Sequence, residues 1–387
     1  MTSGPIVAAL RPLVARRTTF DAVAPATWDA LAARNPWATP FARWAFHRAW
    51  WDGYGETAHD ETILVVDPAM EDRGEEALVA IVPLMHRHGV EPTDEARQTS
   101  LRREPDGRLT PLVATDKVVF FGASYHADYA TALVDPADLP SVAEAVVDLL
   151  TVAAGPHAAH PEPWDVVDLR RLRESDPVLT AFHSAFAARA SGTGWEVGVE
   201  QEDVCPVVSL PAGVEIDGYL ATLGRKERHE IRRKVRRAEA AGRIDLVPSA
   251  DPPADLEAFI DLHQRRWGDD GLFPPTEGGA MSRRFFARLF ELLAGDPVLD
   301  LRFLEVAGRR IAAGVGFDDG VSVYYYNAGV DPDARDLSPG VVMVERYVRD
   351  ALVRGRRRLD FLRGNEPYKY EWGAVDEPIH RLLVTRA

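Results

Sequence analysis

The segment LDFLRGNEPYKYEWG, at residues 359–373, holds the densest group of side chains that could do chemistry. It gathers carboxylates, a lysine, tyrosines and a tryptophan around a Gly-Asn turn, after a strand that an α/β domain would bury. A carboxylate beside a buried sheet can have its pKa raised to suit a general base, and a lysine can orient a carbonyl or a phosphate. The segment therefore predicts one wall of a site, with Asp360 and Lys369 as reactive groups. The competing interpretation pairs Asp360 with a neighbouring arginine and leaves Lys369 as a solvated loop residue.

A strand followed by a helix, over residues 321–354, forms a second candidate region. Ser338, Pro339 and Gly340 provide an N-cap candidate, a residue suited to the first helical turn, and a residue without a side chain. A helix that begins this way offers backbone N–H groups and the positive end of its dipole to an anion such as a pyrophosphate. A well-capped helix without a ligand is the alternative, and the pattern is neither GxGxxG nor a P-loop.

The sequence Asn327-Ala328-Gly329 ends the strand that precedes this helix. A glycine at a strand end can mark a bulge, or an edge where a ligand approaches the backbone closely. If the strands separate there, the backbone N–H of Ala328 or Val330 could hydrogen-bond to an acyl thioester. An ordinary strand terminus is the alternative.

The third candidate region is a basic run, GRKERHEIRRKVRRAEAAGR, at residues 224–243. It carries nine Lys/Arg and three Glu, a net charge of +6, which leaves −21 for the rest of the chain. Ile231, Val235 and Ala238 are spaced i, i+4, i+7, which predicts an amphipathic helix with a narrow buried stripe. The helix could be simply solvated, with arginine stems covering apolar surface, or it could face phosphates or an acidic surface. His229 is predicted to lie on its surface.

Two stretches of the chain repeat a similar order of helices and strands, as hydrophobic periodicity and turn residues indicate. In the first, we expect two helical segments between 27 and 51, the second of which starts after Pro40, and helices over 140–154 and 177–190. We expect strands over 61–67, 77–85, 117–122, 164–169, 195–200 and 204–210. In the second, we expect helices over 216–242, 253–267, 280–294 and 338–354, and strands over 243–248, 299–306, 310–318, 321–330, 357–364 and 379–386. A Pro/Gly turn after Leu210 predicts a boundary between domains at 1–212 and 213–387. The element order indicates an α/β (α+β) protein.

Composition excludes several classes of protein. The chain has 387 residues, 46% hydrophobic and 27% charged, so wholesale disorder is excluded. A net charge of −15 argues against a dedicated nucleic-acid binder. The single cysteine, Cys205, excludes an intramolecular disulfide and a cysteine-based zinc site, and its apolar surroundings predict a buried thiol. We expect no metal and no membrane span, and a cytoplasmic location is the default.

Three motifs together resemble the GNAT-type acyltransferase domain of the cellulose-biosynthesis (CelD-like) acetyltransferases, a group related to the Fem peptidyltransferases. They are RKERHEIRRKVRRAE (225–239), YYYNAGVDPDARDLSPG (324–340) and, most specifically, DFLRGNEPYKYEW (360–372). The first half is similar in element order to the degenerate N-terminal unit of that group. The resemblance implies two tandem GNAT-like domains, each a mixed, mostly antiparallel sheet flanked by helices.

The resemblance also implies an N-acyltransferase, more narrowly an acetyltransferase. It would move an acyl group from acyl-CoA (acetyl-CoA) to an amine of a small molecule or amino sugar, by direct attack on the thioester. LSPGV is poorer in Gly and basic residues than the group's usual pyrophosphate loop, and the first half is expected to bind no CoA. The predicted site residues form three sets: catalytic Asp360, Lys369 and Tyr368; cofactor-binding Asn327, Ala328, Val330, Ser338, Gly340 and Val341; and substrate- or anion-binding Arg228, Arg232, Glu366 and Trp372.

Two other functions stay open at this point. The basic helix would suit an aminoacyl-tRNA-dependent peptidyltransferase of the Fem type, although the −21 elsewhere and the lack of a long coiled-coil insertion weigh against it. A non-catalytic partner in polysaccharide assembly could also keep this fold.

Overall fold

The computed structural model describes residues 10–70, 77–88, 109–110, 116–151 and 164–386. The first half contains both helices and strands. Their bounds are β1 Val14–Arg17, α1 Pro25–Arg34, α2 Trp44–Tyr54, β2 His59–Asp60, β3 Ile63–Val66, β4 Leu78–Val82, β5 Leu84–His88, β6 Lys117–Phe121, β7 Leu133–Val134, α4 Leu139–Thr151, β8 Val166–Arg173, α5 Pro177–Thr193 and β9 Trp195–Ser209.

The second half begins with two helices and ends with a long strand. Its bounds are α6 Ile216–Thr222, α7 Arg225–Ala241, β10 Ile244–Pro248, α8 Pro252–Trp267, α9 Glu277–Leu292, β11 Leu299–Val306, β12 Arg309–Asp318, β13 Ser322–Val330, α10 Pro339–Val353, β14 Arg358–Asp360, α11 Pro367–Tyr370 and β15 Val375–Arg386. The predicted fold class is confirmed, because helices flank sheets that are mixed and mostly antiparallel.

The strands form two sheets in the described part of the chain. The smaller has the order β1-β3-β4-β7, and the larger has eleven strands in the order β10-β11-β12-β13-β14-β9-β15-β8-β6-β5-β2. Each half contains one parallel pair joined by a helix: β6 and β8 around α4, and β13 and β14 around α10. The repeat that the sequence predicts therefore reappears as a repeated strand-helix-strand unit.

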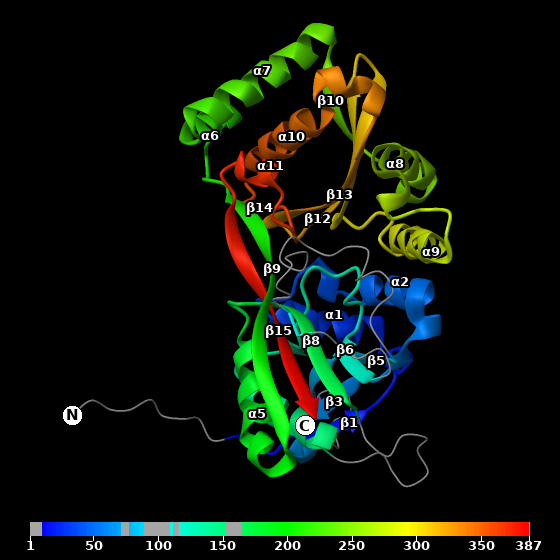
Figure 1. The fold of residues 1–387 in the computed structure, drawn as a ribbon, viewed down its shortest axis with the longest axis vertical. Coiled ribbons are helices and arrows are strands. Elements are labelled where there is room, and N and C mark those ends of the chain that lie inside the picture. Colours follow the sequence, from blue (N-terminus) through cyan, green and yellow to red (C-terminus); the bar gives the residue numbers. More distant parts are fainter. Residues whose placement is uncertain (1–9, 71–76, 89–108, 111–115, 152–163, 387) are drawn as a thin grey trace, which may run out of the picture.

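The last strand, β15, crosses from one half to the other. It lies between β9 and β8, and β9 and β15 run side by side along both halves (Figure 1). The predicted boundary at 212/213 thus separates two stretches of sequence whose strands share one sheet. The division into two domains at this boundary stays a prediction.

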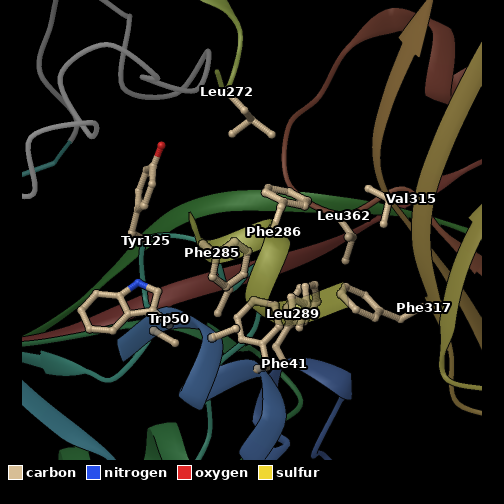
Figure 2. Close-up of a cluster of buried hydrophobic side chains, with 14 of the residues drawn as sticks. Phe41, Trp50, Tyr125, Leu272, Phe285, Phe286, Leu289, Val315, Phe317 and Leu362 are labelled. Carbon is tan, nitrogen blue, oxygen red and sulfur yellow. The ribbon is translucent and has the colours of Figure 1, made fainter. Parts of the chain in front are cut away.

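The two halves also share a hydrophobic core. Figure 2 shows Phe41 and Trp50, from the α2 region, facing Phe285 and Phe286 of α9 and Phe317 of β12. The Phe46 and Phe285 rings meet edge-to-face, with their centroids 5.3 Å apart. Aromatic contacts of this kind add to the burial of apolar area, so the halves stabilise each other.

Several element boundaries differ from the predictions, and three of these differences have a clear structural cause. Two helices replace the single one predicted over 216–242, because the backbone is extended at Leu223 and Gly224. One strand, β9, replaces the two predicted over 195–210, because β15 pairs with it from Trp195 to Val207. Strand β14 ends at Asp360 rather than Gly364, because a tight turn follows in which Leu362 and Gly364 have φ of 57° and 105°.

Candidate functional site

Strands β13 and β14 separate after a short parallel pairing. Ser322–Tyr324 pair with Arg358–Asp360, and beyond Tyr324 the pairings of β13 in the described chain are with β12 alone. A bulge between Val315 and Gly316 leaves Tyr326 without an opposite residue on β12. Bulges bend a strand and increase its twist, which is consistent with the separation. One edge of β13 therefore lies open beside the helix α10.

Backbone hydrogen bonds show which groups face this open edge. Asp331 N–H donates to Ile311 O at 2.8 Å, so Asp331 faces β12. Because the direction of backbone groups alternates along an antiparallel strand, Val330 and Ala328 face away from β12. The indole N–H of Trp267 donates to Ala328 O at 3.2 Å, which agrees with this direction. The predicted N–H groups of Ala328 and Val330 thus lie on the open side, whereas Asn327 faces β12.

Helix α8, rather than a ligand, makes the close approach predicted at Gly329. A Cβ on Gly329 would lie 2.3 Å from the backbone N of His263 in α8. The glycine is therefore required for the packing of a helix against the strand. The same contact brings Trp267, at the end of α8, to the open edge.

Helix α10 starts beside this edge. Ser338 occupies the predicted N-cap position, but its backbone is left-handed with φ 53° and its side chain makes no cap hydrogen bond. Its hydroxyl instead accepts a hydrogen bond from Arg237 of α7 at 2.6 Å. Val341 and Val342 both donate to Ser338 O. Apart from the adjacent residues and the backbone of the helix itself, no atom lies within 4 Å of the position that a Cβ on Gly340 would take. The helix start therefore has open space at Gly340 and one arginine next to it.

The buried stripe predicted for α7 is confirmed, since Ile231, Val235 and Ala238 are its buried residues. The two arginines predicted to bind anions lie towards α6. Arg228 donates to Ala221 O at 3.2 Å, and Arg232 pairs with Asp217 at 2.8 Å.

The arginine of α7 that meets α10 is nine residues beyond Arg228, about 13 Å along a helix. Among the hydrogen bonds of the described residues, it is Arg237 of α7 that bonds to the start of α10. Anion binding by Arg228 and Arg232 stays a prediction.

Aromatic rings line the α10 side of the separated strands. Phe361 meets Tyr325 and Tyr368 edge-on, with centroid distances of 6.1 and 5.8 Å. Burial raises the pKa of Tyr325 to about 12 and raises the pKa of Tyr368 above its usual value. Tyr368 remains 38% exposed. Both phenols keep their protons at neutral pH, so Tyr368 is a hydrogen-bond donor within reach of solvent.

Asp360 ends β14 and faces the opposite side of the sheet from Phe361. Its side chain is 1% exposed. Oδ1 accepts from Leu362 N–H and Oδ2 from the Tyr129 hydroxyl, both at 2.8 Å. Burial raises the pKa of Asp360 to about 6, although both hydrogen bonds oppose that rise. A carboxyl group with this pKa can accept a proton near neutral pH.

Lys369 has a different setting from the one predicted. Its side chain is buried, and Nζ donates to the carbonyls of Leu362, Arg363 and Gly364 at 3.0, 2.9 and 2.8 Å. Nζ also lies 2.9 Å from Glu366 Oε2. An ammonium group has three donors, so these partners leave none for a substrate. The structure corrects the predicted catalytic role: Lys369 holds the turn that follows Asp360.

We expect Lys369→Met to lower the free energy of unfolding by about 3 to 5 kcal/mol, because it leaves three buried carbonyls without their donor. Lys226→Met is the matched control, since Lys226 is exposed at the start of α7 and should change stability by about 0.5 kcal/mol or less. Denaturant titration of the full chain measures both. Equal effects of the two substitutions would contradict this role.

The two remaining predicted residues lie on either side of Lys369. Glu366 is exposed and pairs with Lys369. Trp372 is 1% exposed within the core between α6, α10 and the sheet, and its carbonyl accepts from the Tyr219 hydroxyl. The prediction that Trp372 binds substrate is corrected, because its ring is buried in the core.

Sequence reasoning missed residues of the first half that reach this site. Besides Tyr129, Asp128 accepts a hydrogen bond from Arg363 Nε at 2.9 Å. The ring of His126 stacks on Phe285 at 4.1 Å, and its nitrogens lie 2.8 and 3.1 Å from the hydroxyls of Tyr54 and Tyr326. His126, Asp128 and Tyr129 belong to the segment GASYHADYA, residues 122–130, which follows β6 directly. Polar side chains at the end of a buried strand were the available signal.

Comparisons with known proteins agree with this geometry. The Acetyltransferase (GNAT) domain family model matches residues 225–370. The crystal structure of FemX aligns with 94% of this chain and 96% of its own, with a TM-score of 0.56 and 13% identity. A conserved protein of unknown function from Bacteroides thetaiotaomicron VPI-5482 aligns with 94% of this chain and 98% of its own, with a TM-score of 0.54 and 10% identity.

At these identities, the two structures share the fold of this chain. No curated protein sequence matches it. In the described residues, every helix is too short or too polar to cross a membrane.

Proposed function

We propose that this chain transfers an acyl group from an acyl-CoA thioester to an amine of a small molecule or amino sugar, by direct attack of the amine. One observation carries the proposal: β13 and β14 part after three paired residues, and α10 starts next to the open edge of β13. The GNAT-type domain at 225–370 supports the same chemistry. The finer likeness to the CelD-like group remains a prediction.

The donor would lie along the open edge of β13. In this proposal, the N–H groups of Ala328 and Val330 hydrogen-bond to the acyl and pantetheine carbonyls, where preorganised donors stabilise developing negative charge. The pyrophosphate would lie at the start of α10, around Ser338, Gly340 and Val341, where the positive end of the helix dipole favours anions. Because the N–H groups of Ser338 and Val341 already donate to Arg335 O and Ser338 O, the proposed backbone donor is the N–H of Gly340. The lack of neighbours around Gly340 leaves room for the pyrophosphate.

The acceptor amine would approach from the opposite face, beside Asp360. A bond forms between the amine nitrogen and the acyl carbon, and the bond from that carbon to sulfur breaks. The amine proton goes to the Asp360 carboxylate, which requires a carboxyl group that is ionised at the working pH. The leaving thiolate takes a proton from Tyr368, which lies on the donor side with Phe361.

Calorimetry with acetyl-CoA and longer acyl-CoAs, followed by a screen of thioester consumption with amines and amino sugars, tests this function. We expect binding of at least one acyl-CoA and release of free thiol only when an amine is present. If no acyl-CoA bound, the proposal would be abandoned. A salt-dependent gel shift with charged tRNA would then favour the peptidyltransferase alternative.

A further inference from the structure

We propose that Tyr129 and Asp128, which belong to the first half, are positioning residues for the acyl-transfer site of the second half. They hold the two ends of the turn at residues 360–363, on which the proposed base sits. The inference rests on the proposed function, and it deepens that function by giving the first half a defined part in the reaction.

The contact consists of two hydrogen bonds across the halves. Tyr129 donates to Asp360 Oδ2 at 2.8 Å, and Arg363 Nε donates to Asp128 Oδ1 at 2.9 Å. Asp128, Tyr129 and Asp360 are 7%, 3% and 1% exposed, so solvent competes little for these groups. Asp128 and Tyr129, which are adjacent in the first half, thus bind Arg363 and Asp360, which lie three positions apart in the second half.

The segment that carries Asp128 and Tyr129 is itself fixed to the first half. Ala127 N–H donates to Ala123 O at 2.9 Å, and Ala130 N–H donates to Arg171 O at 3.0 Å. The guanidinium of Arg173 lies 4.9 Å from the centre of the Tyr129 ring, within the range of a cation–π contact. The hydroxyl of Tyr129 is therefore presented by a rigid support, as a positioning group requires.

The two donors act on different oxygens of Asp360. Leu362 N–H comes from the turn itself and binds Oδ1, so it moves with the turn. Tyr129 binds Oδ2 from another part of the chain, which fixes the plane of the carboxylate relative to β13 and its open edge. Hydrogen bonds to a carboxylate favour its ionised form, so Tyr129 also keeps the base available at lower pH.

Other charged and titratable groups face Asp360 from each element around it. They are Tyr324 on β13, Cys205 on β9, Glu377 on β15 and, on its own strand, Arg358. Arg358 is the only cation among them. Its charge remains when the Tyr129 hydroxyl is removed, so a change in the titration of Asp360 can be assigned to that hydroxyl.

Tyr129→Phe tests the inference, because it removes the hydroxyl and keeps the ring. We expect the acidic limb of the kcat/KM profile to move up by about one pH unit, from the loss of one hydrogen bond to a charged group. At pH 5 the activity then falls roughly tenfold relative to wild type, and above pH 8 it stays within about twofold. Carboxyl NMR titration of chains carrying labelled aspartate, with Asp360→Asn for assignment, should show the same upward shift.

Tyr370→Phe is the matched control. Tyr370 also donates to an aspartate at 2.8 Å, but it lies on the exposed surface, where its partner is Asp376. This control should leave both the pH profile and the Asp360 titration unchanged. At the second contact, Asp128→Ala should lower kcat with little change in KM, and Asp128→Asn should restore most of it, since an amide oxygen still accepts from Arg363.

Two outcomes would overturn the inference. One is an Asp360 titration that is the same in Tyr129→Phe and wild type. The other is a loss of activity that is uniform across pH and follows the loss of thermal stability, which would mean a purely structural contact. The NMR titration does not depend on turnover, so a wild-type chain without acyltransferase activity would reject the proposed function and still leave the positioning contact measurable.

Discussion

Replacing Asp360 with asparagine is expected to lower acyl transfer by about 100- to 10,000-fold, the usual contribution of a positioned general base. Asparagine keeps the shape of the side chain and its carbonyl oxygen, but it cannot take the proton from an amine. Single-turnover rates of thioester consumption at pH 7.5 measure the effect, and calorimetry on the same protein should give unchanged donor affinity, since the donor is proposed to lie across the sheet.

Asp376→Asn provides the control for this experiment, because it makes the same chemical change at an exposed aspartate of the second half. It should retain wild-type rates. A rate for Asp360→Asn within about threefold of wild type would show that Asp360 serves the turn alone, through its bond to Leu362.

The same carboxyl group should leave a signature in stability. Burial raises the pKa of Asp360 from its ordinary value of 3.8 to about 6 in the fold. The folded state therefore binds the proton more tightly than the unfolded state, and this stabilisation is complete below about pH 4 and lost as pH rises through about 6. We expect wild type to lose about 3 kcal/mol relative to Asp360→Asn between about pH 3 and about pH 7, measured by urea unfolding at each pH. If the difference in unfolding free energy between wild type and Asp360→Asn stayed constant across this pH range, the raised pKa of Asp360 would be contradicted.

Local patterns explain which features could be predicted. The stripe on α7 follows from the spacing of Ile231, Val235 and Ala238, which any single helix reveals. The strand-helix step before Pro339 is also local, because proline and glycine act on their own turn. The roles of Lys369 and Trp372 were not predictable in this way. Both side chains are buried, and the residues next to them in the sequence do not indicate this burial.

Contacts between distant residues were beyond local reasoning. Tyr129 and Asp360 are 231 positions apart, and Asp128 and Arg363 are 235 apart. Each partner looks like an ordinary polar residue in its own segment. The sequence motifs that predict the site are short and lie in the second half. Only the fold shows that the segment after β6 reaches the carboxyl group of Asp360.

This arrangement gives the first half a physical reason to remain attached to the segment that the GNAT family model matches. Its strand-helix-strand unit repeats the topology of the second half, but β8 of that unit pairs with β15 rather than closing its own sheet. The segment of the first half that follows β6 contributes Tyr129, which hydrogen-bonds to Asp360. The first half therefore depends on the second for β15, which pairs with β8. The second half depends on the first for the hydrogen bonds of Tyr129 and Asp128.

Ending the chain at Ala374, which removes β15, is expected to abolish cooperative folding. This strand pairs with β9 along Val375–Arg386 and with β8 on its other edge, so its loss leaves two long strand edges unpaired. It also removes Ile379, Leu382 and Val384, each 0% exposed, and each worth about 1.5 to 3 kcal/mol of buried apolar surface. Together these losses approach the 5 to 15 kcal/mol that typically separates folded from unfolded domains.

Thermal unfolding followed by near-ultraviolet circular dichroism, with light scattering for aggregation, measures this result. The control is a chain that ends at Arg386, which keeps every paired residue of β15 and should melt like the full chain. If the chain ending at Ala374 gave a soluble protein with a sharp transition, the first half would close its sheet without β15, and the dependence of one half on the other would be limited to the core that α2 and α9 share.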